Sequence, residues 1–164
     1  MRSCEVRVAD STAKTCLSRI KTDLAGINGS GGGYNYDFSG TGSAVIAKMP
    51  IIYDRVPMAF CWWVGESNEH APQLGRYKTM IRFGVGAAVA YAADTPESHT
   101  LAALNASSDL RKALEADRTL NGNVLDLIVL SMEDLVGDVI EADPGLAIVG
   151  GIVEVYHHRT AGAV

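Results

Sequence analysis

The longest strand-like pattern in this chain is RYKTMIRFGVGAAVAYA, residues 76–92. One parity, from Tyr77 to Tyr91, carries mainly apolar or aromatic side chains, and the other carries charged, apolar and glycine residues. Because successive side chains of a strand point to opposite faces of its sheet, alternation over fifteen residues predicts one strand. A strand of this length is expected to project beyond its sheet, alone or as a long β-hairpin, or to bend at its glycines.

Other periodicities predict the remaining elements. Residues 11–27 place apolar side chains at helical spacing, and residues 104–123 predict a second helix capped by Asn105 or Ser107, with Asp109 in its first turn and Gly122 at its end. Residues 93–100 are interpreted as an acidic connector. Apolar segments at 43–49 and 55–67, and strands at 124–135 and 146–159, complete the series. The fold class expected is α+β, a mainly antiparallel sheet flanked by two helices, in a single domain spanning 1–164.

The glycine-rich segment 29–33 is interpreted as a mobile loop, followed by a strand-like alternation at Tyr34, Tyr36 and Phe38. It lacks the lysine of a phosphate-binding loop and the glycine spacing of a dinucleotide-binding turn.

Charge is unevenly distributed along the chain, whose net charge is −5. Residues 94–145 contain eleven acidic and three basic residues, whereas residues 1–60 contain five acidic and seven basic residues. Surfaces of opposite sign that meet in a partner or a second copy are therefore expected, and specific DNA binding is not. No segment is apolar enough to span a membrane, and no signal peptide is recognised, so we expect a cytoplasmic protein.

No catalytic, cofactor-binding or metal-ligating pattern is found. The three cysteines have no C-x-x-C spacing and are expected to be reduced thiols. His157 and His158 are adjacent on a predicted strand, so their side chains are expected to point to opposite faces rather than to share a metal. Of Trp62 and Trp63, one is expected to face away from the core, which favours an interface. We therefore expect that the chain is not an enzyme and binds no cofactor.

The second half of the chain resembles the tail terminator, or tail completion, proteins of long-tailed bacteriophages. The matching positions are a helix with Asp109, Leu110, Arg111, Ala113 and Leu114, then Leu120 and Gly122, and the final strand at Val153–Tyr156. The order of elements agrees over most of the chain, while residues 29–33 and 60–75 match no family pattern. The resemblance implies an antiparallel sheet flanked by helices and a homo-hexameric ring. That ring caps the tail tube, stops its polymerisation and meets the head connector or stopper protein.

The expected partners are therefore a second copy of the chain, the tail tube protein and the connector, with genomic DNA passing through the lumen without specific binding and no membrane. The expected location is the tail or neck of the virion, and the host cytoplasm during assembly. A closed ring joins two different patches of neighbouring subunits. The interface candidates are an acidic set, a basic set and the strand-borne aromatic and imidazole residues: Glu133, Asp134, Asp138, Glu141 and Asp143; Arg7, Lys14, Arg19 and Lys21; Trp62, Trp63, His157 and His158.

Three alternatives remain open from the sequence. Another head–tail joining or tail tube protein belongs to the same class. A small cytoplasmic α+β enzyme or ligand-binding domain, and an adaptor dimer, belong to other classes.

Overall fold

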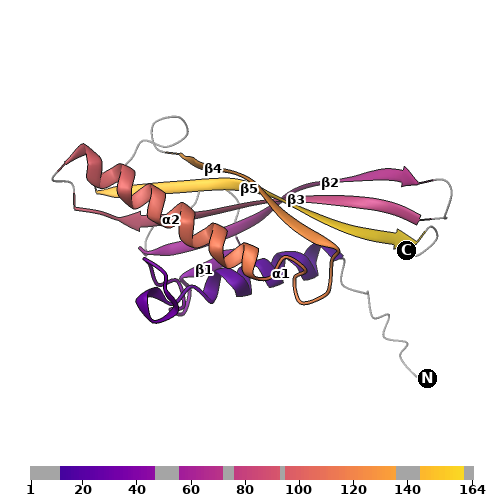
Figure 1. Cartoon of the computed structure of the whole chain (residues 1–164), viewed down its shortest axis with the longest axis horizontal. Helices are drawn as coiled ribbons and strands as arrows, with labels where there is room; N and C mark the ends of the chain where they lie inside the picture. Colours follow the sequence, from indigo (N-terminus) through magenta and orange to yellow (C-terminus); the bar gives the residue numbers. More distant parts are fainter. Residues whose placement is uncertain (1–11, 47–55, 72–75, 93–94, 136–144, 161–164) are drawn as a thin grey trace, which may run out of the picture.

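The computed structural model describes residues 12–46, 56–71, 76–92, 95–135 and 145–160. The elements follow the order α1 (Thr12–Ala25), a short 3₁₀ helix (Gly29–Gly32), β1 (Ala44–Ile46), β2 (Met58–Ala71), β3 (Arg76–Ala90), α2 (Pro96–Ala116), β4 (Asp126–Asp134) and β5 (Leu146–Thr160). The five strands form one sheet in the order β1-β2-β3-β5-β4. All neighbouring strands are antiparallel except β1 and β2, so the protein belongs to the α+β class (Figure 1).

Both helices pack on one face of the sheet. α1 lies over β1 and β2, and α2 lies over β3, β5 and β4, with a smaller contact between the helices. The main core lies between the helices and the inward face of the strands, and β3 contributes Ile81, Phe83, Val85, Ala87 and Val89 to it. These are apolar residues of one parity. The alternation in residues 76–92 correctly predicted the strand, and its apolar parity forms the buried face.

The opposite face of the sheet bears no helix among the described elements. There Trp62 lies over Gly84 and Phe60 lies over Gly86. Each ring is so close that a Cβ atom at the glycine would overlap it. Glycine is therefore required in β3 where the aromatic side chains of β2 cross it. A smaller apolar cluster of Met58, Phe60, Ala88 and Ile148 occupies this face.

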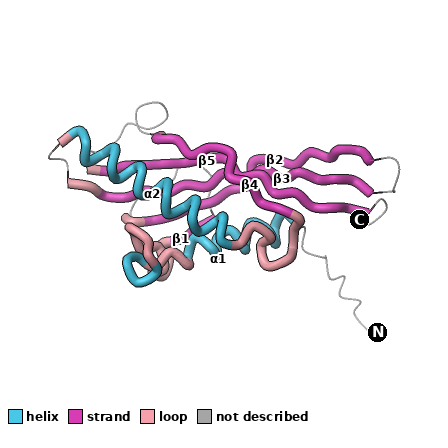
Figure 2. Tube along the Cα trace, viewed as in Figure 1, coloured by secondary structure: helices cyan, strands magenta, loops and turns pink. Residues whose placement is uncertain are grey.

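The hairpin β2–β3 does not project by itself. β5 pairs with β3 along the whole strand, from Leu146 opposite Ala90 to Thr160 opposite Arg76. The ends of three strands therefore extend together past the helices, as Figure 2 shows. The expectation of a long projecting hairpin or single strand is not confirmed.

The second helix begins ten or twelve residues earlier than predicted, because its N-cap is Thr95 and not Asn105 or Ser107. Residues 95–100 are not a connector: Thr95 is the N-cap, its side chain accepts a hydrogen bond from the Ser98 amide, and Pro96 opens the helix. Asp109 is consequently in the middle of α2 rather than in its first turn. The helix ends at Ala116, so Gly122, at φ +79°, lies in the following turn and not directly after the helix.

The glycine-rich segment, predicted as a mobile loop, contains a short 3₁₀ helix (Gly29–Gly32) and contacts α2. Asp109 is 2% exposed, and its carboxylate accepts hydrogen bonds from the Asn35 amide (2.8 Å), the Tyr36 amide (2.8 Å) and the Asn35 side chain (2.9 Å). Lys112 donates to the Gly33 carbonyl at 2.8 Å and lies over the Tyr34 ring. Residues 34–38 form no strand, since only an isolated bridge joins Asn28 and Asp37.

Candidate functional site

The exposed apolar side chains gather at the two edges of the sheet. Of the nine large apolar side chains exposed among the described residues, seven lie there and two, Leu101 and Leu104, lie on α2. The β1–β2 edge carries four of the seven and the β4 edge three: Ile46, Val56, Trp63 and Val64; Leu125, Ile128 and Leu130. An edge strand with exposed apolar residues is a site of association, because its backbone groups and side chains both lack neighbours.

Both edges are interrupted by a β-bulge. The register shifts between Trp63 and Gly65 in β2 and between Val129 and Ser131 in β4, which leaves Val64 and Leu130 as the extra residues. Both bulged residues are about half exposed, at 45% and 52%. A bulge prevents a continuous hydrogen-bonded ladder with an added strand, so these edges offer apolar side chains more than backbone pairing.

The β4 edge is acidic. Glu133 and Asp134 are exposed at the end of β4, and Asp134 lies 3.4 Å from the His99 ring. Asp126, at the start of the strand, forms a bidentate ion pair with Arg118, with N–O distances of 2.7 and 3.0 Å. A hollow of about 460 Å³ opens beside this edge, lined by Glu115, Arg118, Leu127, Ile128 and Val129.

The basic side chains of α1 lie at the other end of the helical layer. Lys14 and Lys21 are exposed and seven residues apart, so they share one flank of the helix. Arg19 and Asp23 lie on the opposite flank, where they meet Asp117 after α2. Lys14 and Lys21 therefore point away from α2 and beside β1 and β2. Of the residues predicted to form patches, Glu133 and Asp134 therefore lie at one edge of the sheet, and Lys14 and Lys21 lie beside the other.

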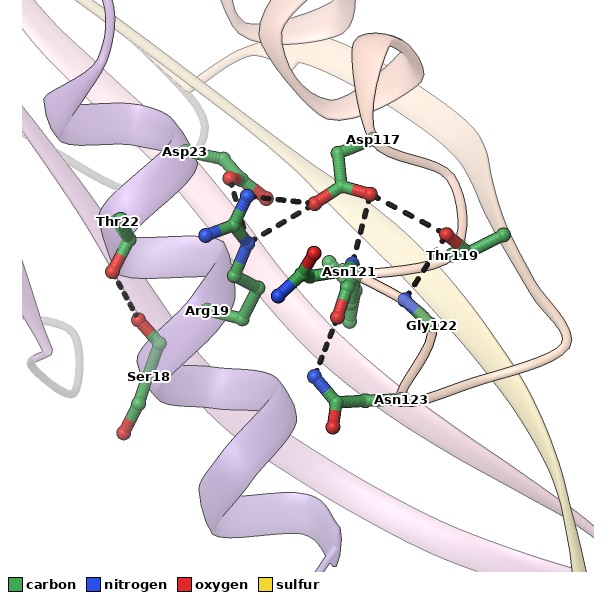
Figure 3. A network of polar contacts seen from close by, with 10 residues as sticks. Ser18, Arg19, Thr22, Asp23, Asp117, Thr119, Asn121, Gly122 and Asn123 are labelled. Atoms are coloured by element: carbon green, nitrogen blue, oxygen red, sulfur yellow. Dashed lines mark hydrogen bonds and ion pairs between the residues drawn. The ribbon is translucent and has the colours of Figure 1, made fainter.

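Arg19 does not belong to that basic patch. Its guanidinium contacts Asp117 at 2.9 and 3.0 Å and Asp23 at 3.2 Å, which ties α1 to the turn after α2 (Figure 3). Burial raises the pKa of Asp23 to about 6, more than the nearby Arg19 lowers it, and one Asp23 oxygen has no hydrogen-bond partner among the described residues. The pKa of Asp117 is lowered, and the largest cause is the hydrogen bond that its carboxylate accepts from the Asn121 backbone amide.

Four predicted interface residues, Arg7, Asp138, Glu141 and Asp143, lie outside the described residues.

Trp62 and Trp63 point to opposite faces, as predicted. Trp62 is half-buried over Gly84 on the helix-free face. Trp63 pairs with Phe83 and so lies on the helix-bearing face, yet it is 55% exposed at the sheet edge. The exposed indole is therefore part of the β1–β2 edge.

His157 and His158 also divide between the faces. His157 pairs with Thr79 on the helix-bearing side and is 9% exposed, whereas His158 pairs with Lys78 on the other side and is exposed. On that helix-free side Arg82 contacts Glu154 at 2.9 Å, and Tyr156 donates to Glu154 at 2.6 Å. The pKa of Glu154 is lowered, and the largest cause is this hydrogen bond from Tyr156.

An apolar pocket of about 310 Å³ opens on the helix-free face. Its lining comprises Trp62, Ser131, Glu133, Leu135, Gly150, Gly151 and Ile152. Sequence reasoning missed this pocket because its lining comes from three strands whose order in the sheet differs from their order in the chain.

Within the described ranges, no three or more histidine, cysteine, aspartate or glutamate residues are grouped so that they could hold a metal ion. Cys16 and Cys61 are buried free thiols. No helix in the part of the chain that the structure describes is long and apolar enough to cross a membrane.

A scan against protein-family models finds no match to this chain, and a search of curated proteins finds no significantly similar sequence.

Proposed function

We propose that this chain is a structural virion protein that terminates a bacteriophage tail. In this role a ring of identical subunits, six in the resembled family, caps the last ring of the tail tube and stops its polymerisation. The opposite face of the ring then meets the head connector. The chain has no catalytic role in this proposal and acts only through protein–protein contacts.

The observation that supports the proposal is the position of the two charged edges. The acidic β4 edge with Glu133 and Asp134, and the basic flank of α1 with Lys14 and Lys21, lie at opposite sides of one subunit. Different patches on opposite sides generate head-to-tail contacts, which close into a ring when the rotation between subunits permits it. The order of elements, helix, strands, helix and two strands, agrees with the order on which the resemblance rests.

A deletion of the gene from the phage genome tests the proposal. Without a cap, tube polymerisation continues past its normal stopping point, so electron microscopy should show tails of variable excess length that carry no heads. Antibody-gold labelling of wild-type particles should mark one end of the tail, at the neck. Deletion particles with normal tails and attached heads would refute the terminator function, as would gold label along the whole tail.

A second candidate, a small ligand-binding domain, is favoured by one observation, the apolar pocket beside Trp62. A bound apolar molecule would change the Trp62 environment, so a hydrophobic fluorescent probe should quench or shift indole emission. The variant Trp62→Phe separates this signal from that of Trp63. Emission that does not respond to the probe in the wild-type chain removes this candidate.

A further inference from the structure

We infer that copies of this chain associate head to tail through opposite edges of the sheet. The β4 edge of one copy, with Leu125, Ile128 and Leu130, docks against the β1–β2 edge of the next copy, with Ile46, Trp63 and Val64. The inference rests on the ring proposed above and deepens it by locating the contact between subunits.

Charge complementarity selects a second copy as the occupant of these edges. The β4 edge ends in the exposed carboxylates Glu133 and Asp134, and the β1–β2 edge is bordered by the exposed ammonium groups of Lys14 and Lys21. Joining two β4 edges would bring like charges together, as would joining two α1 flanks. Joining one of each pairs opposite charges at every contact, which favours a heterologous over a twofold contact.

The apolar side chains are arranged for side-chain packing instead of sheet extension. The bulges shift the pairing of β2 with β3 and of β4 with β5, and the extra residues Val64 and Leu130 are about half exposed. The hollow beside β4 supplies a concave surface, and the half-exposed Trp63 supplies a large side chain of the kind that anchors protein interfaces. The contact therefore buries apolar residues at its centre and places the charged pairs at its rim.

A charge-swap experiment tests which edges meet. The variant Glu133→Lys makes the β4 edge more basic, and the double variant Lys14→Glu with Lys21→Glu makes the other edge acidic. Each variant alone should associate about tenfold more weakly than the wild type at low salt, measured by light scattering and sedimentation. Mixed in equal amounts they should associate again, since acidic and basic edges then alternate around an even-numbered ring.

An apolar pair of variants provides the matched control. Leu130→Ser removes an exposed leucine from the β4 edge, and Leu104→Ser removes a leucine of similar exposure from α2, at 52% and 61% exposed. Leu130→Ser should weaken association about tenfold, while Leu104→Ser should leave it unchanged, with circular dichroism confirming that both variants fold. Equal effects of the two leucine variants, or a mixture of charge variants that stays dissociated, would overturn the inference.

The same variants separate this inference from the proposed function. Rings that form through these edges but do not bind tail tubes would refute the terminator function alone. Rings that cap tubes and tolerate all the edge variants would refute the edge contact alone. A wild-type chain that stays monomeric both at its highest soluble concentration and on tail tubes would overturn both.

Discussion

Removal of the Asp109 carboxylate should release the glycine-rich turn from α2. The carboxylate is almost fully buried and accepts three hydrogen bonds at 2.8–2.9 Å, two of them from the backbone amides of Asn35 and Tyr36. A hydrogen bond to a charged group contributes about 1.5–3 kcal/mol. Asn35 is exposed and Tyr36 half-buried, so their freed amides can reach water once the turn detaches. We therefore expect Asp109→Ala to lower the free energy of unfolding by about 3 kcal/mol, well below the sum of three bonds.

The substitution Asp109→Asn should cost less, for a geometric reason. Its single amide oxygen can still accept both backbone amides, but its NH₂ group then faces the NH₂ group of Asn35. Rotation of the Asn35 side-chain amide by a half turn presents its oxygen instead and restores the third bond. The remaining loss is the exchange of charged for neutral hydrogen bonds, about 1 kcal/mol.

Urea unfolding measures these changes, and amide hydrogen exchange locates them. Exchange at Asn35 and Tyr36 should rise strongly in Asp109→Ala and little in Asp109→Asn. Glu115→Ala is the matched control, because Glu115 is an exposed acid of the same helix, 3.6 Å from Arg111 at the surface, and a pair of this kind contributes at most about 0.5 kcal/mol. If Asp109→Ala is no more destabilising than Glu115→Ala, or exchange at the two amides does not change, the anchoring role of Asp109 is wrong.

Two further predictions concern the α1 network and the glycines of β3. Because burial raises the folded-state pKa of Asp23 to about 6, above its unfolded value near 4, the folded state binds the extra proton between these pH values. This stabilisation, about 3 kcal/mol, is present below pH 4 and is lost as the pH rises through 6. The free energy of unfolding, measured from pH 4 to 7, should therefore fall less with pH in Asp23→Asn than in the wild type. An unchanged pH slope would contradict this. Gly84→Ala should lower the melting temperature because its Cβ atom would overlap the Trp62 ring, whereas Gly65→Ala has open space and should change it little; equal melting temperatures would contradict the crossing of Trp62 over Gly84.

The elements that could be predicted from the sequence are those whose periodicity is set by one buried face. Residues 76–92 alternate because β3 packs one face against both helices, and the buried residues of α1, Cys16, Ile20 and Leu24, recur at helical spacing for the same reason. In both segments the spacing of apolar residues reflects which side chains are buried. The strand, the helix and the α+β class could therefore be predicted from these patterns.

The first half of α2 was missed because its buried side chains are small. Ala102, Ala103 and Ala106 are buried, but the larger Leu101 and Leu104 beside them are exposed, so the spacing of large apolar residues marks no buried face. The helix start was nevertheless encoded by Thr95 as N-cap and Pro96 at the first helical position. The capping residues therefore mark the start of this helix better than its apolar periodicity does.

The structural roles of Asp109 and Asp117 could not be predicted, since the partners that these carboxylates bind across the fold are distant in the chain. Asp109 binds residues 73 and 74 positions away, and Arg19 reaches Asp117 across 98 positions. The positions of the charged groups share this limit. The sequence separated acidic and basic segments, but only the strand order β1-β2-β3-β5-β4 places Glu133 and Asp134 at the sheet edge opposite Lys14 and Lys21.

The exposure of the two edges also bears on how assembly would proceed. Burying the remaining exposed part of a half-exposed leucine, isoleucine, valine or tryptophan contributes about 1 kcal/mol, so the six apolar side chains of the proposed contact supply about 6 kcal/mol. Loss of translational and rotational freedom on association costs about 4–15 kcal/mol, so one such contact is close to balance. An open chain of subunits has one contact fewer than subunits, whereas a closed ring has as many contacts as subunits and forms the last one without a further loss of freedom. Head-to-tail edges of this strength therefore favour a direct passage from monomer to closed ring, with few dimers or trimers at equilibrium.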